Sequence, residues 1–403
     1  MGLFDKNLPG RCYAALLRRL APFYLLWQKV CLMTQSENRP KNIVLLITRG
    51  HDVELLVGLY QKAQRREDLC PSLWLVGKCL RREPKILHIL EEKNMHIDLV
   101  IDFLRLGTVM KRLLSTDAFL STVETTSARH KLPYIITGLA NAFGIPTFTL
   151  QHGFENVGLT YHDDTHGTDV KFSSKTVLTW GPKEVLPVWV AKETRDKCIA
   201  VGCPKDLFAN ENVLATGKGA RQIIGVFDNL HWRRYDEKYV STFLEHLEET
   251  ARQQKDLHFV LKSHPESVRT RTADLTARLR SMKEVTVADL SGKEEEPMTT
   301  PWLLTHALGV ITTPSTIALD AALAKVPVAV TRYGLDLDYY TPLSLIDSLA
   351  DWQSFTTRLK DNIGNNQLKL HGEEFLSKVL VAGDSATKIL DVMVRSTKGR
   401  NQE

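Results

Sequence analysis

The residues of this 403-residue chain that are best suited to chemistry are polar side chains at the ends of apolar runs. The turn Thr312 to Thr316 separates the apolar run Gly309 to Ile311 from the helical pattern Ile317 to Ala324. Proline is preset for a first helical turn, and Ser and Thr hydroxyls can cap it. The free N–H groups at such a helix start attract phosphate, so the turn predicts a phosphate site, although a capped helix in any α/β protein would look similar. The candidate residues are Thr313, Ser315 and Thr316.

A histidine followed by proline, His264 and Pro265, comes after the apolar run Phe259 to Lys262. Its imidazole can donate a charge-assisted hydrogen bond to a phosphate oxygen and stabilise a leaving nucleotide. The alternative is a histidine bonded to the backbone of its own loop, but the hydroxyl turn further along the chain favours the phosphate role. Asp228 and Asn229 end another apolar run of the same half. The predicted donor-binding residues are therefore Asp228, Asn229, Lys262, His264, Pro265, Thr313, Ser315 and Thr316.

Two carboxylates in the first half, Glu124 and Glu155, also follow predicted strands and are candidates for a general base. Either one can instead be a helix-terminal carboxylate that the helix dipole favours. His152 is a third catalytic candidate, because the turn Gln151 to Gly153 ends the strand Thr147 to Leu150. We rank Glu124 ahead of Glu155 as the base.

The loop Tyr161 to Lys171 gathers His162, Asp164 and His166, a spacing for which a metal site must be considered. Gly167 and the lack of a helical period favour a polar loop that covers the substrate instead. We therefore predict no metal, and we assign Gln151, Gly153, His162 and Asp164 to the acceptor side and this loop.

Several function classes are excluded by missing motifs and by composition. The phosphate loops G-x-x-x-x-G-K-[ST] and G-x-G-x-x-G are absent, which argues against ATPases and dinucleotide dehydrogenases. The chain is 43% hydrophobic and 25% charged, as in ordinary globular proteins, and it is nearly neutral beyond residue 35, which argues against nucleic acid. Six scattered cysteines suit a reducing cytoplasm.

The first 40 residues form a basic, amphipathic segment. Residues 1–35 hold five basic side chains against one acidic side chain, with aromatic residues among leucines. This pattern fits an anchor lying on an anionic membrane surface, and a helix packed on the first domain or on a partner subunit is the alternative. No apolar run reaches the ~20 residues of a spanning helix. We expect a cytoplasmic protein, peripheral on the inner face of the inner membrane.

The alternation of strand and helix patterns predicts two doubly wound, Rossmann-like α/β domains, each built on a mostly parallel sheet. We expect them to face a central cleft, with ligands at the carboxyl ends of the strands. The expected divisions are the N-terminal segment 1–40, an acceptor-side domain 41–207, a linker 208–221, a donor-binding domain 222–383 and a C-terminal helix and tail 384–403.

Short motifs at these turns resemble the GT-B glycosyltransferases of bacterial surface polysaccharide assembly, and especially the branch of Kdo transferases, sialyltransferases and polysialyltransferases. The matching pieces are Leu150-Gln151-His152-Gly153, Thr179-Trp180-Gly181-Pro182, Val201-Gly202-Cys203-Pro204, Lys262-Ser263-His264-Pro265 and Thr313-Pro314-Ser315-Thr316 with Asp320-Ala321. The resemblance implies an inverting transferase without metal or cofactor, in which His264, Ser315 and Thr316 hold the donor phosphate. It implies a nucleotide-sugar donor, preferably a CMP-linked ulosonic acid (Kdo or sialic-type), and a lipid-linked glycan acceptor in capsule or lipopolysaccharide synthesis.

The resemblance leaves alternatives open. The second phosphate motif reads Ser-Thr rather than Ser-Ser, and the acidic base motif of sialyltransferases has no match here. UDP-GlcNAc 2-epimerases are similar at Val123 to Ser127 and at Val201 to Pro204, and CDP-glycerol transferases share a His-Gly turn and a His-Pro. The alternatives are therefore a UDP-sugar, GDP-sugar or CDP-glycerol transferase, an epimerase or hydrolase, and an inactive scaffold that binds nucleotide or glycan.

Overall fold

A computed structural model describes residues 39–84, 86–102, 106–127, 130–163, 167–205, 222–264, 267, 273–288 and 299–398. These residues form two compact units. The first contains the described residues within Met1–His152, Thr168–Asp206 and Val381–Glu403. The second contains those within Gly153–Gly167 and Leu207–Leu380. The predicted N-terminal segment up to residue 38 and the predicted linker lie outside the described residues.

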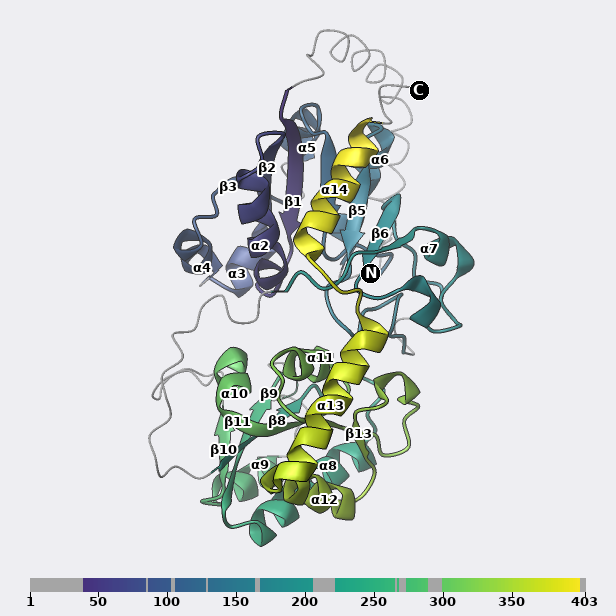
Figure 1. Cartoon of the computed structure of the whole chain (residues 1–403). Coiled ribbons are helices and arrows are strands. Elements are labelled where there is room, and N and C mark those ends of the chain that lie inside the picture. The colour runs from purple at the N-terminus through teal and green to yellow at the C-terminus, as the bar shows by residue number, and fades with distance from the viewer. Residues whose placement is uncertain are drawn as a thin grey trace, which may run out of the picture. The chain divides into compact units, whose positions relative to one another are not determined.

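The first unit is built on a parallel sheet of seven strands in the order β3-β2-β1-β4-β5-β6-β7 (Figure 1). The strands are β1 (Lys41–Ile47), β2 (Leu69–Val76), β3 (Ile97–Ile101), β4 (Ala118–Ser121), β5 (Thr147–Leu150), β6 (Thr176–Thr179) and β7 (Cys198–Ala200). The helices are α2 (Asp52–Gln64), α3 (Gly77–Arg82), α4 (Ile86–Glu92), α5 (Leu106–Leu113), α6 (Lys131–Ala142), α7 (Lys192–Asp196) and α14 (Ser385–Lys398), with a short 3-10 turn η3 (Lys183–Val185).

Helices cover both faces of this sheet. Val44 and Leu46 of β1 pack with Ile136 and Leu139 of α6 on one face. Ile43, Leu45 and Ile47, whose side chains alternate with these along β1 and lie on the other face, are equally buried. Such a strand must be apolar on both sides, which is why it reads as a continuous apolar run in the sequence.

The C-terminal helix α14 packs beside α2 of the first unit (Figure 1). The segment that leads into α14 passes close to Gly202. The φ of Gly202, +87°, suits glycine, and a Cβ there would lie 2.6 Å from the carbonyl oxygen of Val381. The N–H of Val381 also donates to the carbonyl of Trp180 (2.9 Å). Two of the motifs behind the family resemblance therefore hold the C-terminal segment in place.

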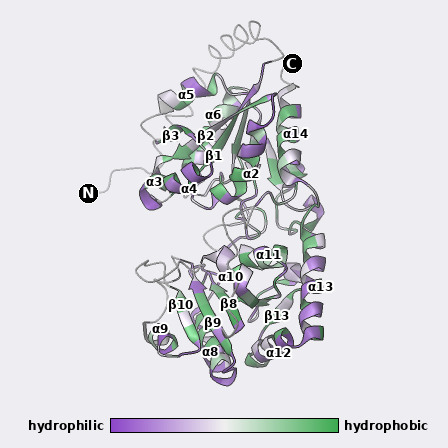
Figure 2. Ribbon diagram, turned by 60° about the vertical axis from the view of Figure 1, so that its left-hand side comes forward, coloured by the Kyte–Doolittle hydropathy of each residue, from purple (hydrophilic) through white to green (hydrophobic). Residues whose placement is uncertain are grey.

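The second unit has a six-stranded parallel sheet in the order β10-β9-β8-β11-β12-β13. The strands are β8 (Gln222–Asp228), β9 (Leu257–Ser263), β10 (Val285–Ala288), β11 (Ala307–Thr312), β12 (Val328–Thr331) and β13 (Ser344–Ile346). The helices are α8 (Glu237–Gln253), α9 (Ala273–Arg280), α10 (Thr300–His306), α11 (Thr316–Leu323), α12 (Leu349–Lys360) and α13 (Asn362–Val379), with a short 3-10 turn η5 (Asp338–Tyr340). Strands β8 and β9 are mainly hydrophobic, whereas α13 carries many hydrophilic residues (Figure 2).

The predicted α/β class, with two Rossmann-like units on parallel sheets, is confirmed. The sequence did not reveal β13, the long helices α12 and α13, or the shorter helices α3, α4, α5, α7, α9 and α10. The segment Gly153–Gly167 belongs to the second unit, although the sequence placed it in the acceptor-side domain. Within the described residues, no helix combines the length and apolar character needed to cross a membrane.

Candidate functional site

The strand order of the second unit reverses between β8 and β11, and open α/β sheets bind ligands at the carboxyl ends of such a pair. Asn229 and Thr313 follow these two strands and bond to each other twice. The Asn229 N–H donates to the Thr313 hydroxyl (3.0 Å), which donates to the Asn229 side-chain oxygen (2.6 Å). The structure therefore brings together two predicted donor-binding turns that are 84 residues apart.

The hydroxyls of the phosphate turn are bonded within the protein. Ser315 is the N-cap of α11 and accepts from the N–H of Ile317 (3.3 Å), as the sequence predicted for this turn. The Thr316 hydroxyl accepts from the N–H of Phe154 (2.9 Å). A Cβ on Gly153 would lie 2.8 Å from that hydroxyl oxygen, so glycine permits the close approach.

His264 lies beside this pair of turns. Its backbone N–H donates to the carbonyl of Asp228 (2.8 Å). The residue is exposed, and its ring stacks on that of His231 with 4.1 Å between the ring centroids. The buried Asp228 carboxylate accepts from the hydroxyl of Ser263 and so fixes the end of β9. Burial lowers the pKa of the half-buried Lys262. Pro265 lies outside the described residues.

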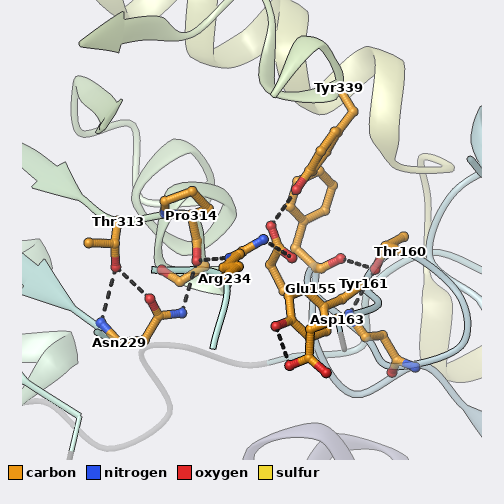
Figure 3. A network of polar contacts seen from close by, with 12 residues as sticks. Glu155, Thr160, Tyr161, Asp163, Asn229, Arg234, Thr313, Pro314 and Tyr339 are labelled. Carbon is orange, nitrogen blue, oxygen red and sulfur yellow. Dashed lines mark hydrogen bonds and ion pairs between the residues drawn. The ribbon is translucent and has the colours of Figure 1, made fainter. Parts of the chain in front are cut away.

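Glu155 is a buried acceptor for three donors of its own unit (Figure 3). One oxygen accepts from the hydroxyls of Tyr339 (2.6 Å) and Tyr340 (2.7 Å), and the other accepts from Arg234 (3.1 Å). Arg234 also donates to the carbonyl of Pro314 (2.9 Å) in the phosphate turn. Glu155 thus ties the segment Gly153–Gly167 to the donor turn, whereas the sequence had offered it as a base in the other domain.

The carbonyl of Pro314 is fixed by two donors, Arg234 and the side-chain amide of Asn229 (2.9 Å each). The hydroxyl of Tyr235 donates mainly to the side-chain oxygen of Asn229 (2.8 Å) and lies 3.3 Å from this carbonyl. The guanidinium of Arg234 also lies over the ring of Tyr161, 4.8 Å from its centroid. The phosphate turn is therefore braced before any ligand binds.

Glu124, in the first unit, is fully buried. It accepts from the Thr149 hydroxyl (2.7 Å) and from the N–H groups of Ser173 (2.9 Å) and Ser174 (2.8 Å). Burial raises its pKa, although these hydrogen bonds act in the opposite direction. The geometry is that of a carboxylate that fixes a loop, and its predicted role as a base stays a prediction.

His152 follows β5 and is partly exposed. Burial lowers its pKa well below the usual value, and the nearby Arg49, His51 and His130 lower it further. Its neighbour Gln151 is buried, and its side-chain oxygen accepts from the N–H of Trp180 (2.9 Å), which makes it a link between strands.

The polar loop after β5 is described only in part. His162 is exposed, and the hydroxyl of Tyr161 donates to Asp163 (2.7 Å) (Figure 3). Asp164 and His166 lie outside the described residues. Among the residues that the structure describes, no cluster of His, Cys, Asp or Glu is suited to a metal ion.

Sequence reasoning missed several residues that build the site. These are His231, Arg234, Tyr235, Tyr339 and Tyr340. The aromatic and basic run Trp232 to Tyr235, which follows β8 by a few residues, could have indicated some of them. Nothing in that run distinguishes Arg233, which is exposed, from Arg234, which is bonded to Glu155.

No family model matches the chain, and no curated protein matches it by sequence. Solved structures match its fold at low identity. A proposed UDP-N-acetylglucosamine 2-epimerase of Listeria monocytogenes has a TM-score of 0.64 and 12% identity, over 89% of this chain and 97% of its own.

Two further matches are a second UDP-GlcNAc 2-epimerase and a glycosyltransferase. A UDP-GlcNAc 2-epimerase of Neisseria meningitidis, solved with UDP-GlcNAc bound, has a TM-score of 0.61 and 11% identity, over 88% and 100% of the two chains. A glycosyltransferase of Rickettsia africae has a TM-score of 0.55 and 11% identity, over 89% and 99%. The fold is therefore the GT-B type that these proteins share.

Proposed function

We propose that this chain is a glycosyltransferase that moves a sugar from a nucleotide to a glycan acceptor. The observation that carries the proposal is the joined set of Asn229, Thr313 and His264 at the carboxyl ends of neighbouring strands, next to the capped start of α11. Backbone N–H groups and an imidazole suit a phosphate. The low-identity matches to a UDP-N-acetylglucosamine 2-epimerase and to a glycosyltransferase support an enzyme that acts on sugars.

In the proposed reaction the acceptor hydroxyl oxygen attacks the anomeric carbon, and the bond from that carbon to the phosphate oxygen breaks. The bonding electrons leave with the nucleotide phosphate, which His264 and the start of α11 stabilise. The hydroxyl proton passes to a base. We propose His152 for this role ahead of Glu124 and Glu155, because it is partly exposed whereas each carboxylate is buried and already accepts three hydrogen bonds.

The donor is tested first by binding. The sequence resemblance favours a CMP-linked ulosonic acid, and the Neisseria enzyme, which was solved with UDP-GlcNAc, favours a UDP-linked sugar. Thermal shifts with CMP, CDP, UDP and GDP rank the nucleotides, because a ligand at 100 times its Kd stabilises the folded state by about 2.7 kcal/mol. His264→Ala should remove the shift, and His88→Ala, at a histidine whose side chain is 75% exposed in the first unit, should not.

Turnover then separates the alternatives. Donor incubated with a glycan acceptor should yield the extended glycan and free nucleotide, and donor alone should stay intact. Product without acceptor would favour an epimerase or hydrolase. Nucleotide binding without turnover of any donor would favour a scaffold.

A further inference from the structure

Arg49 and His130 form a fixed pair in the first unit. Arg49 follows β1, and its guanidinium donates to Nε2 of His130 (2.7 Å). Because Nε2 accepts, the proton of the neutral ring is on Nδ1, which lies 2.8 Å from the hydroxyl of Thr125. His130 is 5% exposed, so this pair orients the guanidinium from the protein side.

Two more imidazoles lie in the same place. His51, in the turn after β1, has its ring centroid 5.9 Å from that of His152, which follows β5. The strand order of this sheet reverses between β1 and β4, so the cluster occupies the switch point where open α/β sheets bind ligands. The His51 side chain is 45% exposed, and Arg49 and His152 are partly exposed, so a ligand from solvent can reach them.

Acidic groups lie near this cluster, and most of them are bonded to other residues. Asp52 is fully buried, and one of its oxygens accepts from the N–H (2.8 Å) and the hydroxyl (2.7 Å) of Thr48. Its other oxygen lies 3.6 Å from Nε2 of His51. Glu54 is paired with Lys205 (3.2 Å). The exposed carboxylate of Glu83 also lies close, since a Cβ on Gly50 would be 1.9 Å from its Oε2. Among the described residues, the permanent cation and the three imidazoles therefore lie beside the buried Asp52 and the exposed Glu83.

We propose that Arg49 and His51 bind an anionic group of the sugar acceptor, a carboxylate or a phosphate, and that His130 is a positioning residue for Arg49. The guanidinium fork matches either group with two parallel hydrogen bonds. The inference rests on the proposed function in naming the acceptor as the ligand. It would place the acceptor beside His152, the candidate base.

Binding of the anion should be coupled to proton uptake. Burial, Arg49, His51 and His130 lower the pKa of His152, and the pKa of His51 is lowered by burial and by Arg49 and Lys205, against Asp52 and Glu54. A bound anion opposes these effects and raises the pKa of His51. The His51 ring therefore takes up a proton on binding, and the affinity should rise as the pH falls, whereas His152 must stay neutral to accept the proton of the acceptor hydroxyl.

The test is an NMR titration of the full chain with 13C-labelled histidine, without any nucleotide. The probes are glucuronic acid for a carboxylate, glucose 1-phosphate for a phosphate and methyl glucoside as the neutral control. We expect one anionic probe to shift the His51 and His152 signals, with at least tenfold tighter binding than methyl glucoside. Arg49→Gln should weaken this binding at least tenfold, and Arg112→Gln, at an exposed arginine of α5, should leave it unchanged.

His51→Gln, at a half-exposed position, keeps the test valid if Arg49→Gln unfolds, and it should weaken binding severalfold. Equal binding of the neutral sugar, or full affinity in the Arg49→Gln or His51→Gln protein, would overturn the proposal. Competition by the nucleotide that binds best would also overturn it, because the site would then serve the donor. Anion binding that depends on Arg49 in a protein without transferase activity would refute the proposed function and leave the anion site standing.

Discussion

Replacing Glu155 by Gln tests whether this residue is a brace or a base. The carboxylate is 8% exposed, and the side chain of its partner Arg234 is 15% exposed. Breaking a buried ion pair on one side costs about 3–5 kcal/mol, because it leaves an uncompensated buried charge. The amide keeps an oxygen for Tyr339 and Tyr340 but turns an N–H₂ group or a weaker acceptor toward Arg234. We therefore expect Glu155→Gln to lower the free energy of unfolding by about 3 kcal/mol.

The assay is urea unfolding followed by circular dichroism at pH 7. Asp256→Asn is the matched control, since it removes a carboxylate of the same unit that is 61% exposed and pairs with Lys360 at 3.1 Å. Such a surface pair contributes less than about 1 kcal/mol. Combining Glu155→Gln with Arg234→Met should cost about 2 kcal/mol less than the sum of the two single changes, because the double variant leaves no buried charge unpaired.

A specific pattern would refute this reasoning. If Glu155→Gln unfolds within about 0.5 kcal/mol of the parent protein, the carboxylate does not brace the unit. If the same variant also loses kcat while nucleotide binding is unchanged, Glu155 acts in the reaction, as the sequence first indicated.

Three smaller changes test other contacts by urea unfolding. Gly202→Ala should cost about 3 kcal/mol, because its Cβ would meet the carbonyl of Val381 at a positive φ; an unchanged midpoint would contradict this. Gly153→Ala should cost about 1–2 kcal/mol, because its Cβ would lie 2.8 Å from the hydroxyl oxygen of Thr316, the first residue of α11. Full stability would show that the Thr316 side chain can rotate away at little cost. Lys62 donates to Asp384 and holds the pKa of that carboxyl at about 2, below the unfolded value of about 3.9. The stability that this pair contributes to the folded state is therefore present above about pH 4 and is lost as the pH falls through 2. Asp384→Asn should therefore cost less than about 1 kcal/mol at pH 7 and much less at pH 2. A difference that persists undiminished at pH 2 would point instead to the hydrogen bond that Asp384 accepts from the N–H of Thr387 at the start of α14.

The parallel strands could be placed from the sequence because burial on both faces leaves a continuous apolar run. Thr147–Leu150 is a strand over the very residues predicted, and the apolar run Phe259 to Lys262 lies within β9. Strand β13 was not predicted because its three residues, Ser344–Ile346, form too short a run to be recognised as a strand. Element positions therefore follow from local pattern wherever the pattern is long enough.

The donor turns could be placed for the same reason, since polar residues at the ends of parallel strands share one edge of a sheet. The roles of the two carboxylates could not be predicted from the sequence. Glu124 and Glu155 look alike in sequence, each coming after a strand, and what distinguishes them is the set of donors around each one. Tyr339 is 184 residues from Glu155, and no local pattern predicts that contact.

The bonding of the phosphate turn changes what its hydroxyls can do for a ligand. Ser315 caps α11 and Thr316 receives the N–H of Phe154, so both act first as braces for the backbone. A phosphate at this turn would then depend on backbone N–H groups held in a fixed direction, and on His264, more than on hydroxyl contacts of its own. Because the turn is ordered in advance by Asn229 and Arg234, binding needs little further ordering, which favours affinity. Loss of either brace should therefore weaken nucleotide binding even though neither side chain needs to touch the nucleotide.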